Sequence, residues 1–418
     1  MRKTGGCRSC EVAQVAGRSF IAPHVAELPK SGIRKFFDIV AQRKDVVSLG
    51  VGEPDFDTPW HISRAAVTAL EDGATHYTSN LGTPELRQSI VAYVKRRLGA
   101  EYDWKKKVLV TVGVSEAIDL AVRAITSPGD EILYHEPCFV SYAPTIRLAH
   151  GVRVSVETRA EDSFRLTVDA LEAKVTPRTK ALLLNFPCNP TGATLTRADL
   201  KAIAKFVLRH DLLLLADEVY GELVYPPAAG GRQAPKPISF ASLPELRDSL
   251  VLLNGFSKSW AMTGYRLGYA CGPAEVVDTM MKIHQYGIMS APTIAQHAGV
   301  EAMNRGDDDV ERMRREYQRR RDFIVGALNA MGLETFMPKG AFYVFPCIRS
   351  TGLSSEEFCL RLLNEHEVAC VPGSAFGACG EGFVRMSYAT SYEKIELAMK
   401  RLADFVRGLR CARGGRKA

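Results

Sequence analysis

Three apolar runs in the sequence are each followed at once by polar residues that could do chemistry. Runs that are apolar throughout are typical of strands buried on both faces of a sheet. In an open parallel sheet, ligands bind outside the carboxyl ends of the strands. We therefore expect an amide, an acid, a phenol and a lysine to meet at one edge. The runs, each with the residues that follow it, are Ala181 to Leu184 with Asn185 to Gly192, Leu212 to Ala216 with Asp217 to Tyr220, and Ser249 to Leu253 with Asn254 to Lys258.

Lys258 stands between a buried run and the apolar, glycine-containing segment Trp260 to Tyr269. A lysine in partly apolar surroundings has a lowered pKa and can form an imine with a carbonyl. An aspartate such as Asp217, placed beside a pyridine nitrogen, keeps that nitrogen protonated as an electron sink. Together these two residues predict a site for pyridoxal phosphate.

Each of these residues also has a simpler interpretation. Asn189 to Gly192 has the composition of a turn, and Asp217 could cap a helix. Tyr220 could be a core aromatic residue with a solvated hydroxyl, and Lys258 could be a surface lysine, which is where most lysines lie. The apolar sequence on both sides of Lys258 favours the chemical interpretation.

The motifs, taken in order, resemble those of class I/II aminotransferases, in the fold-type I superfamily of pyridoxal-phosphate enzymes, and look closest to the aspartate/aromatic group. The first three motifs are Asn189-Pro190-Thr191-Gly192, Asp217-Glu218-Val219-Tyr220 and Ser257-Lys258-(x)7-Arg266. Five more agree with the family: Gly50 to Phe56, Tyr77 to Arg87, Gly340 to Tyr343, Pro372 to Phe376 and Val384 to Ala389. Each motif alone is weak, but the ordered set is specific and covers about Pro29 to Leu402.

The resemblance implies roles for the residues around the cofactor ring. Lys258 matches the lysine that forms the Schiff base and then moves a proton between Cα and C4′. Asp217 matches the acid paired with the ring nitrogen, and Asn189 and Tyr220 match the donors to the ring 3-oxygen. Phe139 falls where the family stacks an aromatic ring on the cofactor, and a core phenylalanine is the alternative interpretation.

A phosphate site is predicted where Gly113 to Glu116 opens a helix directly after the apolar run Val108 to Val112. Backbone amides at a helix start bind phosphate, and the resemblance adds basic and hydroxyl side chains. The candidate phosphate ligands are Val114, Ser115, Ser257 and Arg266. Gly255 departs from the family, because many members have serine three residues before the lysine, so one phosphate hydrogen bond would be lost or replaced by water.

Tyr77 matches a tyrosine that reaches the cofactor phosphate of the neighbouring subunit. The resemblance therefore implies a homodimer with shared active sites. The segment Ile283 to Ile288 is expected to contribute to the neighbouring site or to the dimer interface, and a merely buried interface segment is the alternative.

Arg385 matches the arginine that binds the substrate α-carboxylate, a task that suits the two parallel donors of a guanidinium. Gly52 and Asn189 complete that pocket by resemblance, and a surface ion pair is the alternative for Arg385. Some relatives that prefer aspartate have lysine at the position of Ser115, so its absence argues against a dicarboxylic specialist. We expect an aromatic or broad range of neutral amino donors, with 2-oxoglutarate as acceptor.

The expected fold is α/β: a large domain with a mostly parallel seven-stranded sheet flanked by helices, and a smaller α+β domain. The alternation of apolar runs with the helix-patterned segments Ser115 to Ile125, Val140 to His150 and Thr196 to His210 predicts βαβ units. After about Asn304 the pattern changes to longer helices and short strands. The predicted boundaries are a flexible leader over 1–28, the small domain over 29–56 and 304–405, the large domain over 57–303, and a basic tail over 406–418.

Composition excludes several other classes of protein. The chain of 418 residues has 54 Lys and Arg against 47 Asp and Glu, a net charge of +7 too diffuse to indicate nucleic acid. No apolar run is long enough for a membrane helix, and neither a signal peptide nor a metal site is expected. The 10 cysteines are scattered, and the single CxxC of Cys7 and Cys10 is a weak metal motif, so we expect a cytoplasmic enzyme.

Two other functions remain open from the sequence. A pyridoxal-phosphate enzyme that eliminates, such as a carbon–sulfur lyase or an aminocyclopropane-carboxylate synthase, shares most of these motifs. Some transcription regulators use this fold as an effector sensor, but the roughly 30 residues before Ser31 are too few for a helix-turn-helix unit.

Overall fold

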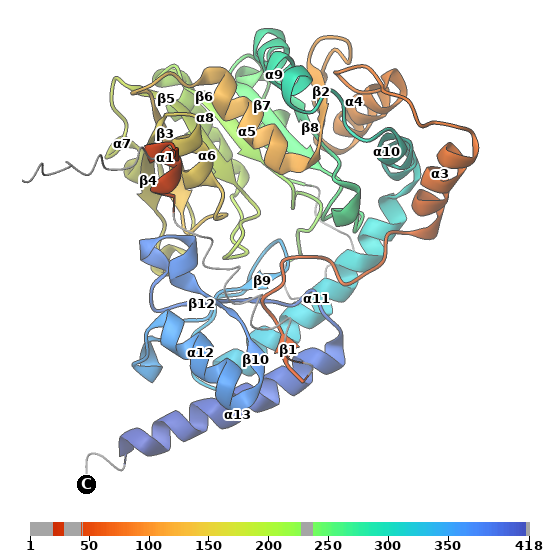
Figure 1. Ribbon diagram of the computed structural model, residues 1–418. Helices are drawn as coiled ribbons and strands as arrows, with labels where there is room; N and C mark the ends of the chain where they lie inside the picture. The colour runs from red at the N-terminus through yellow and green to blue at the C-terminus, as the bar shows by residue number, and fades with distance from the viewer. Residues whose placement is uncertain (1–19, 29–42, 44, 227–236, 415–418) are drawn as a thin grey trace, which may run out of the picture.

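The computed structural model describes residues 20–28, 43, 45–226 and 237–414. Its centre is a seven-stranded sheet with the order β2-β8-β7-β6-β5-β3-β4 (Figure 1). All neighbouring strands are parallel except that β8 runs antiparallel to both β2 and β7, which confirms the mostly parallel sheet. The strands are β2 Val108–Thr111, β3 Glu131–Glu136, β4 Val152–Glu157, β5 Thr179–Asn185, β6 Leu213–Asp217, β7 Leu250–Gly255 and β8 Gly268–Cys271.

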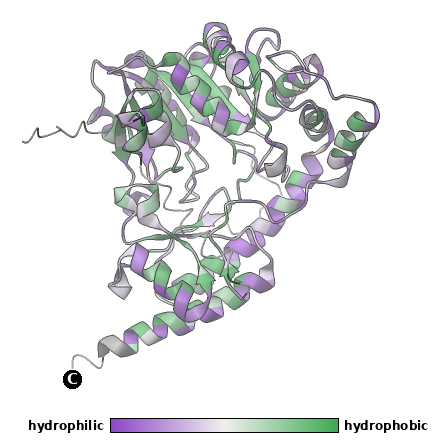
Figure 2. Ribbon diagram, viewed as in Figure 1, coloured by the Kyte–Doolittle hydropathy of each residue, from purple (hydrophilic) through white to green (hydrophobic). Residues whose placement is uncertain are grey.

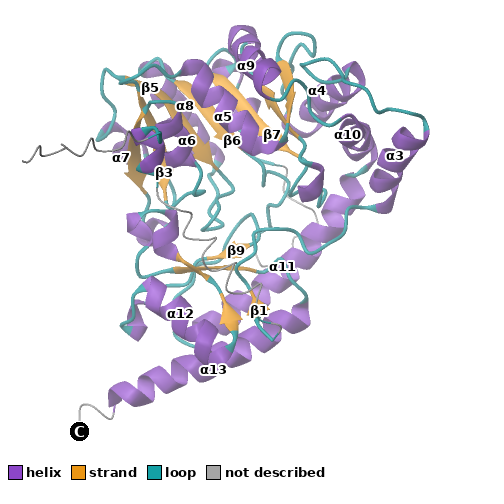
Figure 3. Cartoon of the chain, in the orientation of Figure 1, coloured by secondary structure: helices purple, strands orange, loops and turns teal. Residues whose placement is uncertain are grey.

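Helices cover both faces of this sheet, as βαβ connections require (Figure 3). Successive strand residues alternate between two apolar clusters: Leu183 and Leu215 belong to one, Leu182 and Leu214 to the other. The first cluster includes residues of α5 Gly113–Ile125, α6 Tyr142–Leu148 and α9 Ala274–Gly287. The second includes residues of α3 Trp60–Glu71, α4 Pro84–Leu98, α7 Val168–Glu172, α8 Arg197–Arg209 and α10 Thr293–Arg305. Figure 2 shows the central strands in the green of apolar residues.

A second group of elements lies below the sheet in Figure 1 and contains two small sheets. One sheet pairs β1 with β10 in parallel, and the other has β12 between β11 and β9, antiparallel to both. The strands are β1 Val47–Ser48, β9 Tyr343–Val344, β10 Val368–Ala369, β11 Val371–Pro372 and β12 Val384–Ser387, and the helices are α11 Asp307–Ala330, α12 Ser355–His366 and α13 Tyr392–Gly414. How the chain divides into domains stays a prediction.

Short 3-10 helices complete the described chain. They are η1 Ala160–Asp162, η2 Phe240–Ser242, η3 Pro244–Leu246, η4 Thr263–Tyr265, η5 Arg349–Thr351, η6 Gly373–Phe376 and η7 Ala378–Gly380. The Thr196 side chain accepts from Asp199 N and the Asp199 side chain accepts from Thr196 N, which makes a capping box at the start of α8.

Part of each predicted end segment is helical. The segment after residue 405 continues α13 through Gly414, because Val406 and Leu409 carry the apolar stripe of the helix onto the core. Within the leader, residues 23–26 form α1 Pro23–Ala26, which packs near α6, and Glu27 pairs with Arg147. Residues 1–19, which include the CxxC motif, lie outside the described residues, as do 29–42 and 415–418.

Candidate active site

Lys258 follows β7 and lies half-buried between the large sheet and the lower group of elements. Its Nζ donates to the carbonyl oxygen of Gly52 at 2.6 Å and lies 5.9 Å from the centre of the Phe342 ring. Burial lowers the pKa of Lys258 to about 8; the charges of Arg385 and Arg266 act in the same direction and those of Glu53 and Asp217 oppose it. Roughly a tenth of this amine is therefore unprotonated at pH 7, far more than for an ordinary lysine, and the unprotonated form is the nucleophile.

Asp217 ends β6 and is buried. Its Oδ2 accepts from the Tyr142 hydroxyl at 2.7 Å, and its Oδ1 accepts from Val219 N at 3.2 Å. Burial raises the pKa of Asp217 to about 6, while these hydrogen bonds and the charge of Lys258 oppose the rise. Asp217 is thus a buried, oriented carboxylate that suits a protonated ring nitrogen as partner. Tyr142 lies in the predicted helical segment Val140 to His150, but nothing in the sequence marks it as a site residue.

Arg385 lies in β12 with only 2% of its surface exposed. Its Nη1 donates to Asn189 Oδ1 at 2.9 Å and its Nη2 to the carbonyl oxygen of Gly50 at 2.5 Å. Both acceptors are uncharged, and Nε is buried without a partner among the described residues. Burial lowers the pKa of Arg385. A buried guanidinium that lacks a counter-ion within the described chain is suited to receive a carboxylate.

The hydroxyls of Tyr220 and Tyr343 share a hydrogen bond of 2.8 Å, and both rings are buried. The guanidinium of Arg385 lies 4.6 Å from the centre of the Tyr343 ring. A Cβ at Gly52 would approach the Tyr343 hydroxyl to 2.6 Å, so only glycine fits there. Tyr343 thus contacts both the predicted ring residues and the predicted carboxylate pocket. Tyr343 ends the motif Gly340 to Tyr343, which agrees with the family, but no role was assigned to Tyr343 from the sequence.

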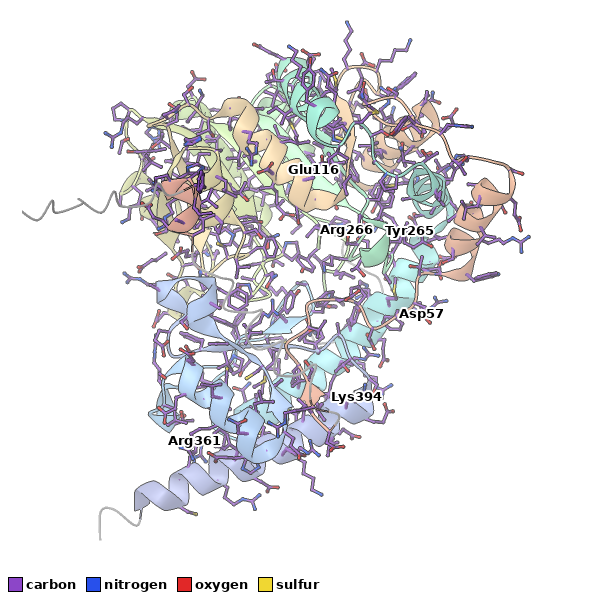
Figure 4. The ribbon with its side chains drawn as sticks, in the orientation of Figure 1. Asp57, Glu116, Tyr265, Arg266, Arg361 and Lys394 are labelled. Carbon is purple, nitrogen blue, oxygen red and sulfur yellow. The ribbon has the colours of Figure 1, made fainter. Side chains whose placement is uncertain are left out.

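The start of α5 and Arg266, which are predicted to form a phosphate cradle, lie against each other. Gly113 has φ of 76° and a Cβ there would lie 2.7 Å from Arg266 Nη2, so the guanidinium packs against the first residue of the helix. The N-cap residue Val112 makes no side-chain hydrogen bond, which leaves the first-turn N–H groups uncapped. Figure 4 labels Arg266 close to this end of α5. Ser115 is exposed at this end and Ser257 is buried after β7.

Gly255, the departure from the family pattern, has a steric reason. A Cβ at this position would lie 2.8 Å from Val114 Cγ2 and 3.0 Å from the carbonyl oxygen of Leu267. A serine would push against Val114 at the start of α5, so glycine fits this chain.

Two predicted residues lie less centrally. Phe139 is half-buried, and its ring meets that of Tyr142 edge to face at 5.9 Å, one side chain away from Asp217. Tyr77 is 82% exposed, and no contact joins it to the other predicted site residues within the described chain. The structure therefore brings Lys258, Asp217, Asn189, Tyr220 and Arg385 near one another, with Gly52, and leaves Tyr77 at the surface.

The residues present fit pyridoxal phosphate. The lowered pKa of Lys258, the buried carboxylate of Asp217 and the uncapped helix start beside Arg266 match an aldehyde, a pyridine nitrogen and a phosphate in turn. No cluster of metal-binding side chains occurs within the residues that the structure describes.

This fold and this lysine-centred site define a class of protein, and comparison identifies it. Residues 44–402 match the family Aminotransferase class I and II, and the chain belongs to that family. It is a pyridoxal-phosphate-dependent aminotransferase, an enzyme that transfers amino groups. The comparisons give no support to the lyase alternative.

Relatives of this chain are named for two different kinds of substrate, aspartate and aromatic amino acids. The chain is 48% identical over 379 residues to an aspartate aminotransferase of Pyrococcus abyssi, covering 90% of this chain and 96% of that protein. It is 47% identical over 374 residues to aromatic-amino-acid aminotransferase 2 of Thermococcus litoralis, covering 89% and 94%.

Solved structures agree with the fold. An aromatic aminotransferase from Pyrococcus horikoshii has a TM-score of 0.84 and 46% identity, covering 90% of this chain and 99% of that one. The aspartate aminotransferase of Thermus thermophilus with maleate has a TM-score of 0.86 and 38% identity, covering 93% and 100%. Among the described residues, no helix combines the length and the apolar character needed to cross a membrane.

Proposed function

We propose that this aminotransferase takes its amino group from an aromatic or other neutral L-amino acid and passes it to a 2-oxo acid such as 2-oxoglutarate in a ping-pong reaction. The charges around Lys258 carry this proposal. Arg385 and Arg266 are the cations that influence the Lys258 amine, and Glu53 adds a negative charge. With Arg385 assigned to the α-carboxylate and Arg266 to phosphate, neither of these two cations is left to pair with a charged donor side chain.

The residues of this chain divide the binding of the cofactor between them. Lys258 holds its aldehyde carbon, Asp217 its ring nitrogen, and Asn189 and Tyr220 its 3-oxygen. Gly113 to Ser115, Ser257 and Arg266 hold its phosphate, and Phe139 covers one ring face. Once bound, pyridoxal phosphate supplies an electron sink for the charge that develops at the substrate Cα.

Lys258 and Arg385 then act on the substrate. The α-carboxylate binds N–H groups of the Arg385 guanidinium, which Asn189 Oδ1 and the carbonyl oxygen of Gly50 hold in place through Nη1 and Nη2. The Lys258 amine would take the proton from the substrate Cα and hold it at Nζ for the return step. Its lowered pKa lets the amine accept that proton near neutral pH.

A homodimer with shared active sites is part of the proposal. Tyr77 and Tyr286 are 82% and 89% exposed, and Ile288 and Met289 are also exposed. A hydrogen bond of 2.7 Å from Asn80 Nδ2 to the carbonyl oxygen of Met289 ties the two segments together. They thus form one exposed apolar surface, which supports the expected contact with a partner and the role of Tyr77 at the partner's phosphate. The variant Tyr286→Arg should lower the mass measured by light scattering from that of a dimer to that of a monomer.

The substrate proposal is tested by the absorption spectrum of the purified holoenzyme during titration with L-amino acids in the absence of oxo acid. Phenylalanine, tyrosine and leucine should convert the coloured form to the pyridoxamine form at lower concentrations than aspartate. Conversion by aspartate at equal or lower concentration would contradict the preference for neutral donors. Release of ammonia and an oxo acid without conversion would instead indicate elimination.

The acceptor needs a second assay, because 2-oxoglutarate has a second carboxylate that Arg385 does not bind. The pyridoxamine form is mixed with 2-oxoglutarate, oxaloacetate or phenylpyruvate, and recovery of the coloured form is followed. We expect 2-oxoglutarate to be used.

We also propose a cytoplasmic location, supported by the free state of the cysteines that the structure describes.

A further inference from the structure

Behind the phosphate cradle, a buried histidine from α9 contacts a glutamate in the first turns of α5. His284 Nδ1 lies 2.8 Å from Glu116 Oε1, and the His284 side chain is 0% exposed. The other carboxylate oxygen, Glu116 Oε2, accepts from Val112 N at 2.5 Å. Since a carboxylate only accepts, His284 donates from Nδ1. Glu116 is thus held on two sides, by the chain that leads into the helix and by the neighbouring helix.

The position of Glu116 matters because of its charge. It lies three residues after Gly113, against which the Arg266 guanidinium packs, and Figure 4 labels Glu116 and Arg266 near the same end of α5. A free carboxylate at a helix start is attracted by the same first-turn N–H groups that would bind a phosphate, and it repels a phosphate dianion. The hydrogen bonds from His284 and Val112 occupy both oxygens of Glu116, so that the carboxylate is held by these two partners and not by the N–H groups of Gly113 to Ser115.

The contact also fixes the backbone that forms the cradle. The Val112 N–H, directly before the helix, is satisfied by Glu116, so the N–H groups of Gly113, Val114 and Ser115 are the ones left for a ligand. His284 Nε2 is buried with no partner among the described residues. Burying a ring nitrogen without a hydrogen-bond partner costs free energy. That the ring is nevertheless buried here points to a role for its one contact, the hydrogen bond to Glu116.

We propose that His284 is a positioning residue for cofactor binding: it holds and screens Glu116, so that the start of α5 is open to the phosphate. His284 touches neither substrate nor cofactor and acts only through Glu116. This inference rests on the proposal that Gly113 to Ser115 and Arg266 bind the phosphate.

The test compares two ligands of the apo-protein, pyridoxal phosphate and pyridoxal, whose dissociation constants are measured by fluorescence. The dissociation constant of pyridoxal divided by that of pyridoxal phosphate, called the ratio below, isolates the contribution of the phosphate. General destabilisation of the protein would not change this ratio. In His284→Gln we expect the affinity for pyridoxal phosphate to fall about tenfold while that for pyridoxal stays the same. In the double variant His284→Gln/Glu116→Gln, removal of the charge should restore the ratio to within about threefold of wild type.

Two controls separate this inference from the phosphate site itself. His61→Gln removes another histidine–carboxylate contact, from His61 to Glu301, on the other side of the sheet, and should leave the ratio unchanged. Arg266→Gln should lower the ratio if the cradle is the phosphate site. An unchanged ratio in Arg266→Gln would overturn the site, and with it this inference. A lowered ratio in Arg266→Gln with an unchanged ratio in His284→Gln would overturn the inference alone, as would a double variant no better than His284→Gln.

Discussion

The two sides of the active site differ in how the chain builds them. The side proposed for the cofactor is the edge of one sheet, where Asn185 is in register with Asp217, and Asp217 with Leu253, on neighbouring parallel strands. The side proposed for the substrate is assembled from distant segments, since Arg385 binds the carbonyl oxygen of Gly50 across 335 positions of sequence. Figure 1 shows the two groups of elements facing each other.

This difference indicates a division of labour. The cofactor side is rigid because strand pairing fixes it, and it carries the groups with strongly shifted pKa values, Lys258 and Asp217. The substrate side depends on contacts between separate groups of elements, and the bonds Arg385–Asn189, Lys258–Gly52 and Tyr220–Tyr343 are among these contacts. Changes on the first side should act mainly on turnover, and changes on the second mainly on substrate affinity.

Among changes on the cofactor side, Lys258→Ala is expected to lower turnover the most. The variant loses both the imine anchor and the group that moves the proton, so kcat should fall about ten-thousandfold or more. It should still bind pyridoxal phosphate through the phosphate site, which equilibrium dialysis measures. Retention of more than a few per cent of turnover would show that another base moves the proton.

Asp217→Asn tests the same side with the shape of the residue kept. The amide cannot hold a proton on the ring nitrogen, so kcat should fall about a hundredfold or more while KM changes little. Steady-state kinetics with a saturating acceptor measures both constants. If KM rises and kcat does not fall, Asp217 belongs with the substrate side and the comparison fails.

Arg385→Lys is the corresponding change on the substrate side. One ammonium replaces a two-pronged guanidinium, so the KM for the amino donor should rise about ten- to hundredfold, with a smaller change in kcat. The control is Tyr343→Phe, which leaves the guanidinium in place and removes one hydroxyl. An unaltered KM in Arg385→Lys would move the carboxylate site elsewhere.

The same contrast explains what could be predicted from the sequence. Strand ends are visible as apolar runs followed by polar residues, so the amino-acid sequence alone places Asn189, Asp217 and Lys258 at one edge. Three of the helices that cover the sheet, α5, α6 and α8, were also predicted from their apolar spacing.

Contacts between elements without a shared pattern could not be predicted. Nothing near Tyr142 indicates that its hydroxyl reaches Asp217, 75 residues on, and His284 and Glu116 are separated by 168. Basic residues near the C-terminus suggested a tail after 405, yet Val406 and Leu409 at helical spacing were the stronger signal. Such pairings depend on how helices pack on the sheet, which periodicity alone does not specify.

His61 offers the mildest test. Its ring contacts the start of α11, the helix that reaches both groups of elements. From α3 its ring contacts Glu301 of α10 at 2.8 Å and Asp309 of α11 at 2.9 Å, and α11 runs on to pack against β9 and α13. Burial opposes the charge on His61, but hydrogen bonds to the two carboxylates outweigh it and raise its pKa above the ordinary value. A raised pKa in the folded state stabilises the protein below the unfolded value of 6.5, and this stabilisation disappears as the pH rises through the folded value.

His61→Gln should therefore lower Tm more at pH 5.5 than at pH 8.5, by about 1 °C because the site is partly exposed. Differential scanning fluorimetry at the two pH values measures the difference, and kcat and KM should stay at wild-type values because His61 touches neither side of the site. A shift in KM alone would show that the start of α11 sets how the substrate side meets the sheet edge. In that case the substrate side would extend along α11 as far as α3, and its dependence on distant contacts would be greater than Arg385 and Gly50 alone indicate.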